Sequence, residues 1–125
     1  MNEKATIRLG VIGLGAIGVM VANAGEALGM SVIGFDPYLS VDNAWGLSQS
    51  VGRAGTLEQL VSQVDYLTVH APLNSNTEGM VNATTLQHAK PGIRILNFAR
   101  GGLVDSRAVI DAIGAGTVTR YVTDF

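Results

Sequence analysis

The chain has 125 residues with 16 glycines, no cysteine and a formal net charge of −2, and 47% of its residues are hydrophobic while 14% are charged. An average soluble domain carries roughly 25% charged residues, so this chain is poor in charge. This balance excludes a disordered chain, which needs low hydrophobicity and high charge. It also argues against a nucleic-acid partner, which requires a basic face. The missing cysteines exclude disulfides, thiolate metal sites and a thiolate nucleophile, and the length suits one domain.

The apolar composition does not predict a membrane span. The longest uncharged run, Leu9 to Gly25, has 17 residues and includes five glycines and Asn23. A spanning helix needs about 20 mostly apolar residues, and glycine at this density weakens a helix. We therefore expect a soluble, cytoplasmic chain with no membrane partner.

Short β-branched apolar runs recur along the chain, and each gives way to a helical pattern. The predicted strands are Ile7–Ile12, Ser31–Phe35, Asp65–His70, Ile93–Phe98 and Tyr121–Thr123, with a weaker candidate at Ser50–Arg53. These runs are continuously apolar rather than alternating, which is typical of parallel strands covered on both faces.

The helical segments between these runs have recognisable ends, formed by capping residues and by glycines. The predicted helices are Ala16–Leu28 before Gly29, a short helix capped by Thr56 with Gln59, a helix from Asn82 to about His88, and Ser106–Ala115 between Asp105 and Gly116. A further helical patch follows Ser40, and its Trp45 is expected to pack against the sheet edge. The alternation of strand and helix predicts a doubly wound, Rossmann-like α/β domain with a parallel sheet of about six strands.

The segment after the first predicted strand matches a dinucleotide-binding fingerprint. Gly13, Gly15 and Gly18 form G-x-G-x-x-G between a strand and a helix, which is the context that makes this otherwise weak pattern informative. The first glycine permits a tight turn, the second lets a pyrophosphate approach the backbone, and the third lets the helix pack closely on the sheet. The helix N-terminus then offers N–H groups to phosphates. A purely structural glycine-rich turn is the alternative.

Asp36 ends the second predicted strand, 18 residues beyond Gly18. A carboxylate at this position accepts hydrogen bonds from ribose hydroxyls and repels a 2′-phosphate. Pro37 and Tyr38 follow it and offer no arginine for such a phosphate, so the pattern predicts NAD rather than NADP. An Asp-Pro turn without a ligand is the alternative.

A second informative segment, Asn97–Asp105, leaves the carboxyl end of a predicted strand. Ligands bind at this edge in open α/β sheets. Arg100 stands here between Ala99 and two glycines, so its guanidinium could hold a substrate carboxylate and keto oxygen through paired hydrogen bonds. It would also stabilise the charge that develops on that oxygen. From the residues alone, a surface or capping arginine remains an alternative.

Together these motifs resemble the coenzyme domain of the D-isomer-specific 2-hydroxyacid dehydrogenases. The resemblance covers nearly the whole chain and rests on Gly10–Gly18, Gly34–Tyr38, His70–Leu73, Lys90–Gly92 and Asn97–Asp105. It implies that residues 1–125 are a single NAD-binding domain of a larger two-domain enzyme and lack the substrate domain. We therefore expect the chain to bind NAD without turnover, and the intact enzyme to be a homodimer.

The resemblance also implies roles for single residues. Arg100 would bind the substrate's carboxylate and carbonyl beside the nicotinamide. The expected cofactor contacts are the amides of Ala16 and Ile17 at the pyrophosphate, Asp36 with Pro37 at the adenosine ribose, Ala71 and Pro72 at the adenine, Thr77 near the phosphates, Phe98 and Ala99 along the nicotinamide, and Asp124 at its carboxamide. The family usually has one residue between this aspartate and the next phenylalanine, which this chain lacks.

The two histidines are not expected to move a proton. In the family a histidine paired with a glutamate does this, and the resemblance places both beyond Phe125. His70 is expected to line the cofactor and His88 to be solvated. The implied reaction is hydride transfer between NAD and a small D-2-hydroxy or 2-keto acid.

The expected substrate is 3-phosphoglycerate, because the segment Arg120–Phe125 resembles family members that act on it. Glycerate, lactate and formate remain open. A non-enzymatic NAD-sensing domain is the alternative of another class, and it has no reason to place Arg100 before two glycines.

Overall fold

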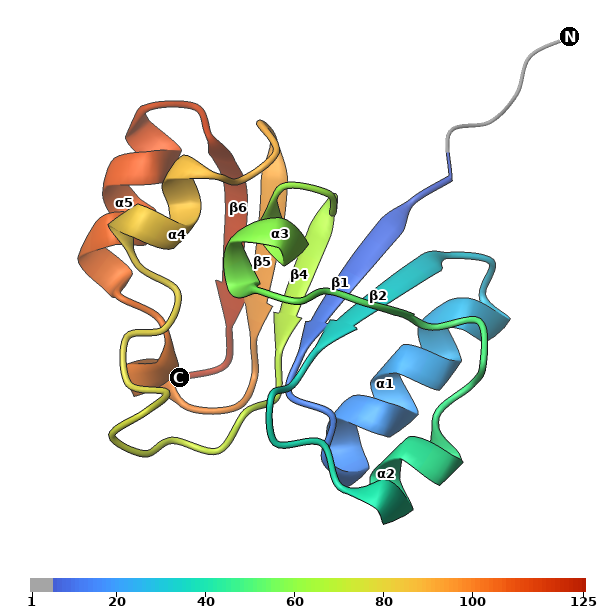
Figure 1. Cartoon of the computed structure of the whole chain (residues 1–125). Helices are drawn as coiled ribbons and strands as arrows, with labels where there is room; N and C mark the ends of the chain where they lie inside the picture. Colours follow the sequence, from blue (N-terminus) through green and yellow to red (C-terminus); the bar gives the residue numbers. More distant parts are fainter. Residues whose placement is uncertain (1–5) are drawn as a thin grey trace, which may run out of the picture.

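The sheet confirms the predicted doubly wound α/β architecture. The computed structural model describes residues 6–125. Its elements are β1 (Arg8–Ile12), α1 (Ala16–Ala27), β2 (Ser31–Phe35), α2 (Val41–Gly46), β3 (Gly52–Arg53), α3 (Leu57–Val61), β4 (Tyr66–Val69), α4 (Ala83–Gln87), β5 (Ile93–Asn97), the 3-10 turn η1 (Gly101–Leu103), α5 (Ser106–Gly114) and β6 (Val118–Thr123). The six strands are parallel and lie in the order β3-β2-β1-β4-β5-β6. Helices α1 and α2 lie on one side of the sheet and α3, α4 and α5 on the other (Figure 1).

The predicted helix ends are confirmed with one change. Gly29 and Gly116 have φ of 91° and 84° and end α1 and α5 in the left-handed conformation. The Thr56 hydroxyl accepts the Gln59 N–H at 3.1 Å, as a capping box requires. The Gln59 side chain, however, accepts from the N–H of Gly55 at 3.0 Å rather than from that of Thr56. Local signals therefore identify these ends correctly, and only the return contact is shifted by one residue.

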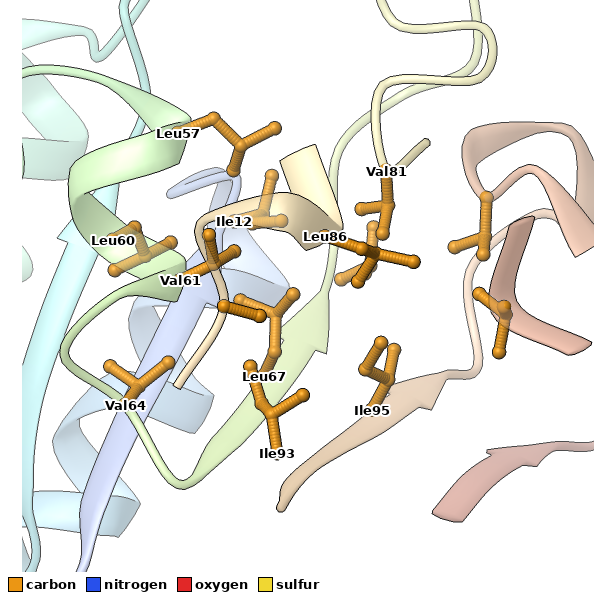
Figure 2. Packing of buried hydrophobic residues seen from close by; sticks show 14 of the residues in the cluster. Ile12, Leu57, Leu60, Val61, Val64, Leu67, Val81, Leu86, Ile93 and Ile95 are labelled. Atoms are coloured by element: carbon orange, nitrogen blue, oxygen red, sulfur yellow. The ribbon is translucent and has the colours of Figure 1, made fainter. Parts of the chain in front are cut away.

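Two hydrophobic clusters hold the helices to the sheet. The larger lies under α3, α4 and α5 and includes Leu60, Leu67 and Ile95, all fully buried (Figure 2). The smaller lies under α1 and is made of Leu9, Val11, Leu14, Val19, Ala22 and Val32. The central strands β1 and β4 contribute to the core along nearly their whole length, as their continuous apolar runs predict.

The outer strands differ from the prediction of strands buried on both faces. In β5, Ile93 and Ile95 are buried while Arg94 and Leu96 are only partly so, and in β6 Val118 alone is buried. This happens because α1 packs on β1 and β2, whereas α5 packs on β6 from the other side of the sheet, so the outer strands are covered mainly on one face. Strand β6 begins at Val118, whereas the sequence predicted a start at Tyr121. The prediction missed this start because it searched for continuous apolar runs, and a partly solvated edge strand also contains polar residues.

The expectation that Trp45 packs against the sheet edge is wrong, because its side chain is 84% exposed. Polar contacts tie the end of α2 to α1 instead: the Asn23 side chain donates to the Gly46 carbonyl at 2.8 Å and accepts from the Ser48 N–H at 2.8 Å. Across residues 6–125 no helix combines the length and apolar character that crossing a bilayer requires.

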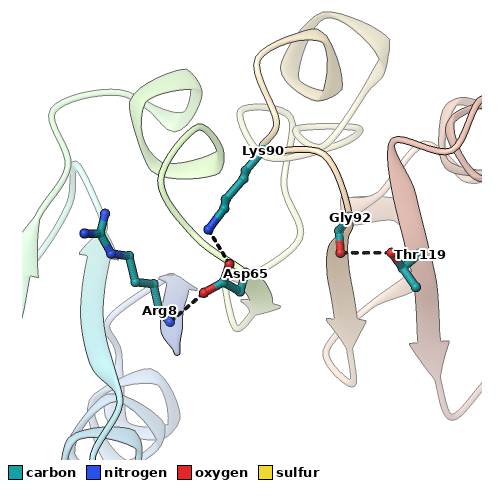
Figure 3. A network of polar contacts seen from close by, with 5 residues as sticks. All are labelled: Arg8, Asp65, Lys90, Gly92 and Thr119. Carbon is teal, nitrogen blue, oxygen red and sulfur yellow. Dashed lines mark hydrogen bonds and ion pairs between the residues drawn. The ribbon is translucent and has the colours of Figure 1, made fainter. Parts of the chain in front are cut away.

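Asp65 joins three strands at the amino edge of the sheet (Figure 3). Its carboxylate accepts the Arg8 N–H at 2.9 Å and pairs with Lys90 Nζ at 2.6 Å, while its carbonyl accepts the Arg94 N–H at 2.9 Å. The hydrogen bond from Lys90, together with that from Arg8, lowers the pKa of Asp65 below its ordinary value of 3.8. Asp65 therefore links β1, β4 and β5 at the edge opposite the site.

Candidate functional site

The carboxyl ends of β1, β2 and β4, which lie toward the lower edge of the view in Figure 1, contribute residues to the wall of a cavity of about 580 Å³. This size is typical of a small-molecule or cofactor site. Seven of the predicted cofactor-binding residues line it: Gly13, Gly15, Asp36, Pro37, Ala71, Pro72 and Thr77.

The first and third glycines of the fingerprint are required by close packing. Gly13 has φ of 89°, donates its N–H to the Phe35 carbonyl at 2.9 Å, and would place a Cβ 2.6 Å from the Ala71 nitrogen. A Cβ on Gly18 would lie 1.8 Å from the carbonyl oxygen of Gly13. Gly13 directly follows β1, so Gly18 lets α1 lie close to the end of this strand, in keeping with the predicted close helix–sheet packing.

The second glycine leaves open space at the start of α1. A Cβ on Gly15 would meet no heavy atom within 4 Å. The first bond of the helix runs from Val19 N–H to the Gly15 carbonyl at 2.9 Å, so the N–H groups of Ala16, Ile17 and Gly18 have no intrahelical acceptor. The first turn has no acidic residue and no side-chain cap. This terminus fits the pyrophosphate of a dinucleotide, because it combines free donors with the positive end of the helix dipole.

The Asp36 carboxylate fastens the glycine loop to the end of β2. One of its oxygens accepts the Leu14 N–H at 2.8 Å and the other accepts the Tyr38 N–H at 2.8 Å. An ionised carboxylate has about four acceptor positions, so it keeps capacity for ribose hydroxyls. The clamp on Leu14 is a function of Asp36 that sequence reasoning missed, because the donor comes from a different strand end.

The loop after β4 forms another wall of the cavity. The Thr77 side chain is 8% exposed, and its hydroxyl donates to the Pro72 carbonyl at 2.6 Å and accepts the Asn74 N–H at 2.9 Å. These bonds already use the hydroxyl, so Thr77 shapes the wall, and its contact with a phosphate stays a prediction.

His70 lines the same cavity, as expected. Its Nε2 lies 2.8 Å from the Thr68 hydroxyl oxygen. Burial lowers the pKa of His70 below its ordinary value of 6.5 and thus favours the neutral ring. A neutral, hydrogen-bonded imidazole suits the expected lining role.

Arg100 stands on a turn built by a buried amide. Asn97 is fully buried, and its side chain donates to the Arg100 carbonyl at 2.9 Å and accepts the Ala99 N–H at 3.1 Å. The Arg100 side chain is exposed, with Nη1 3.3 Å from the Ala99 carbonyl. Asn97 thus fixes the backbone that carries Arg100, a role that sequence reasoning did not assign.

The two glycines after Arg100 are explained by close approach. A Cβ on Gly101 would lie 3.2 Å from the Phe125 ring, and one on Gly102 would lie 3.1 Å from the Leu73 side chain. The Gly102 carbonyl also accepts the Gly79 N–H at 2.7 Å. These contacts join the loop after β5 to the loop after β4, so the Arg100 segment borders the cavity wall.

The remaining predicted residues lie at the same edge without lining the cavity. They are Ala16, Ile17 and Gly18 at the start of α1, Phe98, Ala99 and Arg100 after β5, and Asp124 after β6. Their contacts with cofactor or substrate stay predictions.

The cavity also has lining residues that sequence reasoning did not place there: Tyr38, Asn43, Gly55, Thr56, Leu57, Glu58, Asn74, Asn76 and Met80. The weak strand candidate Ser50–Arg53 could have indicated the lining residues that follow it, because β3 ends at the same edge of the sheet as the cavity.

A glycine loop, an open helix N-terminus and a carboxylate at the end of the next strand define a dinucleotide-binding domain. The model of the NAD-binding domain of D-isomer specific 2-hydroxyacid dehydrogenases matches residues 1–125. The chain belongs to this family, and NAD is the cofactor of the family's domain.

Individual relatives agree with this assignment. D-3-phosphoglycerate dehydrogenase of Bacillus subtilis is 38% identical over 117 residues, which are 93% of this chain and 22% of the relative. The human enzyme of the same name is 40% identical over 110 residues, 86% of this chain and 20% of the relative. The chain thus spans about a fifth of the length of these curated relatives.

Solved structures show the same fold. Apo D-lactate dehydrogenase of Escherichia coli has a TM-score of 0.86 at 31% identity, over 95% of this chain and 37% of that one. An NAD complex of a D-isomer specific 2-hydroxyacid dehydrogenase from Lactobacillus delbrueckii has a TM-score of 0.82 at 30% identity, over 94% and 35%. The predicted fold, family and cofactor are therefore confirmed.

Proposed function

We propose that the chain is the NAD-binding part of a larger enzyme that transfers a hydride between NAD and a D-2-hydroxy acid. The observation that carries the proposal is the exposed Arg100, held by buried Asn97 at the sheet edge that also bears the nucleotide cavity. A regulatory NAD-sensing domain, the second candidate, gives no reason to build a buried amide clamp under an exposed guanidinium.

The residues of the chain bind and orient in this proposal. NAD, when bound, supplies or accepts the hydride. The N–H groups at the start of α1 hold the pyrophosphate, and the free acceptor positions of Asp36 hold the adenosine ribose. Arg100 binds the substrate carboxylate and stabilises the negative charge that develops on the carbonyl oxygen. The His–Glu pair expected from the resemblance would move the proton.

The proposed substrate is 3-phosphoglycerate. The curated relatives at 38% and 40% identity carry that substrate in their name, whereas the D-lactate dehydrogenase neighbour is 31% identical. The test compares kcat/KM for 3-phosphoglycerate and D-lactate in the enzyme that contains this chain. A higher value for D-lactate would reject 3-phosphoglycerate and leave the reaction class intact.

Calorimetry with NAD tests the chain itself. We expect binding of NAD without NADH oxidation when a 2-keto acid is added to the isolated chain. Turnover by these 125 residues alone would contradict the proposal that the proton-transfer pair lies elsewhere. The homodimer and the cytoplasmic location are part of the same proposal, and sedimentation of the intact enzyme tests the first.

Replacing Arg100 by alanine in the intact enzyme tests the assigned role directly. We expect a lower kcat and a higher KM for the hydroxy acid, with a loss of roughly 2–4 kcal/mol in kcat/KM. NAD affinity should change little. The matched control is Arg107→Ala, an exposed arginine at the start of α5, which should leave both constants unchanged. A similar effect of the two substitutions would remove Arg100 from the reaction.

A further inference from the structure

Strand β6 pairs with β5 through a register that contains one extra residue. The register shifts between Ile93 and Arg94, so Thr119 of β6 is left out of the pairing. The Thr119 hydroxyl donates to the Gly92 carbonyl at 3.0 Å beside this shift (Figure 3). One extra residue moves every side chain that follows it to the opposite face of the sheet, and bulges of this kind re-aim side chains near active sites. The shift therefore decides which side chains of β6 lie beneath the loop after β5.

Tyr121 faces the buried side of β5 because of this shift. Tyr121 is paired with Ile95 and Thr123 with Asn97, and paired side chains of neighbouring strands lie on the same face of the sheet. Ile95 and Asn97 are fully buried, and Tyr121 is half-buried against the hydrophobic cluster that includes Ile95. Without the extra residue Arg120 would lie opposite Ile95, with its charge toward the core. The shift thus places a tyrosine, rather than an arginine, on the side where Asn97 is buried.

The Tyr121 hydroxyl contacts the amide that holds the Arg100 turn. An asparagine amide has two N–H donors. Nδ2 of Asn97 lies 2.9 Å from the Arg100 carbonyl oxygen and 3.4 Å from the Tyr121 hydroxyl oxygen, and it donates to both. The amide oxygen accepts the Ala99 N–H. Because Asn97 is fully buried, an N–H without an acceptor would be costly, and Tyr121 supplies the acceptor that the turn itself does not.

Thr123 lies opposite Asn97 in the same register but does not support it. The Thr123 Oγ1 is buried and makes no hydrogen bond within residues 6–125. A position beside Asn97 is therefore not sufficient to hold its amide. Tyr121 and Thr123 each carry one hydroxyl on the same face of β6, and of the two it is the Tyr121 hydroxyl that contacts Asn97. Thr123 is thus a matched control for Tyr121.

We propose that Tyr121 is a positioning residue for Arg100. Its hydroxyl fixes the Asn97 amide, the amide fixes the Arg100 carbonyl, and the turn then sets the direction from which the guanidinium meets the substrate. The inference rests on the proposed role of Arg100 in binding the hydroxy acid, and it adds a residue from a different strand. Tyr121 is not among the residues that line the nucleotide cavity, so its hydroxyl should affect the reaction without affecting the binding of NAD.

The kinetic test uses Tyr121→Phe and Thr123→Val in the intact enzyme, each alone and combined with Arg100→Ala. Tyr121→Phe should lower kcat/KM for the hydroxy acid by about two- to tenfold, the range of one neutral hydrogen bond, and leave the KM for NAD unchanged. In the Arg100→Ala background it should cause no further loss, because the guanidinium that it positions is missing. Thr123→Val should leave kcat/KM unchanged in both backgrounds.

A second measurement reports on the contact itself and needs no turnover. In the chain labelled with nitrogen-15, the side-chain amide protons of Asn97 should exchange slowly with water. Tyr121→Phe removes one acceptor and should make this exchange faster, whereas Thr123→Val should leave its rate near that of wild type. Equal exchange rates in wild type and Tyr121→Phe would mean that the hydroxyl does not hold the amide, and would overturn the proposal. Circular dichroism confirms the fold of each variant.

The kinetic outcomes separate this proposal from the one on which it rests. If Arg100→Ala alone leaves kcat/KM unchanged, the proposed role of Arg100 is rejected, and this inference with it. If Arg100→Ala lowers kcat/KM but Tyr121→Phe behaves like wild type, the role of Tyr121 alone is overturned. An equal loss from Tyr121→Phe with and without Arg100 would also overturn it, because the hydroxyl would then act on the fold rather than through the arginine.

Discussion

The loops after β1 and β2 differ from the loop after β5 in how completely their functional groups are held. We call the first region the nucleotide half. Contacts with backbone atoms fix Gly13, Gly18 and Asp36 there. In the second, the reaction half, Asn97 fixes the backbone but the Arg100 side chain extends from it exposed. A preorganised site loses little entropy when it binds its ligand. The nucleotide half is thus ready to bind, whereas the Arg100 side chain must still be ordered.

The largest expected effect comes from breaking the nucleotide half at Gly18. Gly18→Ala would place a Cβ 1.8 Å from the Gly13 carbonyl oxygen. The backbone would have to move to relieve this clash. We expect a loss of about 3 kcal/mol in the free energy of unfolding, the upper range for overpacking. Urea denaturation measures it.

Gly15→Ala is the matched control within the same motif. Its Cβ meets no atom within 4 Å, so the stability should stay within about 0.5 kcal/mol of wild type. NAD affinity should nevertheless fall, because the methyl group enters the space in front of the helix N-terminus. Equal losses of stability in the two variants would contradict the assigned packing.

Asn97→Ala tests whether the base of the reaction half is as firmly held. The substitution leaves the Ala99 N–H and the Arg100 carbonyl without their partner. An unsatisfied buried polar group costs about 1–3 kcal/mol, so we expect a loss near 2 kcal/mol in urea denaturation. In the intact enzyme kcat should fall while NAD affinity is retained. Unchanged NAD affinity with unchanged kcat would mean that the turn does not position Arg100.

Lys90→Met probes an ion pair at the amino edge of the sheet, opposite both of these regions, and its effect is the smallest. The partly exposed Lys90–Asp65 pair should contribute about 0.5 kcal/mol at pH 7. Because the pKa of Asp65 is lowered below 3.8 in the folded state, its stabilisation is present above that pH and is lost as the pH falls through the folded pKa.

The difference in unfolding free energy between wild type and Lys90→Met should therefore shrink as the pH falls below about 4. Thermal unfolding at a series of pH values, from neutral into the acid range, measures this difference. Arg107→Met is the control, because its pair with Asp111 is 4.0 Å apart and largely exposed. A difference that does not shrink at all as the pH falls below about 4 would exclude the ion pair as its cause.

Features set by neighbouring residues were predictable from the sequence. The caps Thr56, Asn82 and Asp105 each act on an N–H two or three residues later, and all three are confirmed. The glycine motif and Asp36 were found because their spacing along the chain is short and the strand-helix context is local.

Features that depend on distant partners were not predictable. The outward direction of Trp45 follows from contacts between α1 and α2. That Arg53 and Asp36 line the same small cavity follows from the pairing of β2 with β3, a strand of two residues. In each case the deciding contact joins segments whose proximity only the fold establishes.

The strand order also has a consequence for how fast the chain folds. Strand β1 pairs with both β2 and β4. Its connection to β4 and the later part of the chain includes the Arg8–Asp65 contact, which joins residues 57 positions apart. Closing a loop of this length precedes any gain from the contacts it brings together, so non-local parallel pairing slows folding. We expect the β1–β4 seam to form late, with each half gaining structure first. Substitutions at this seam should then change the unfolding rate more than the folding rate.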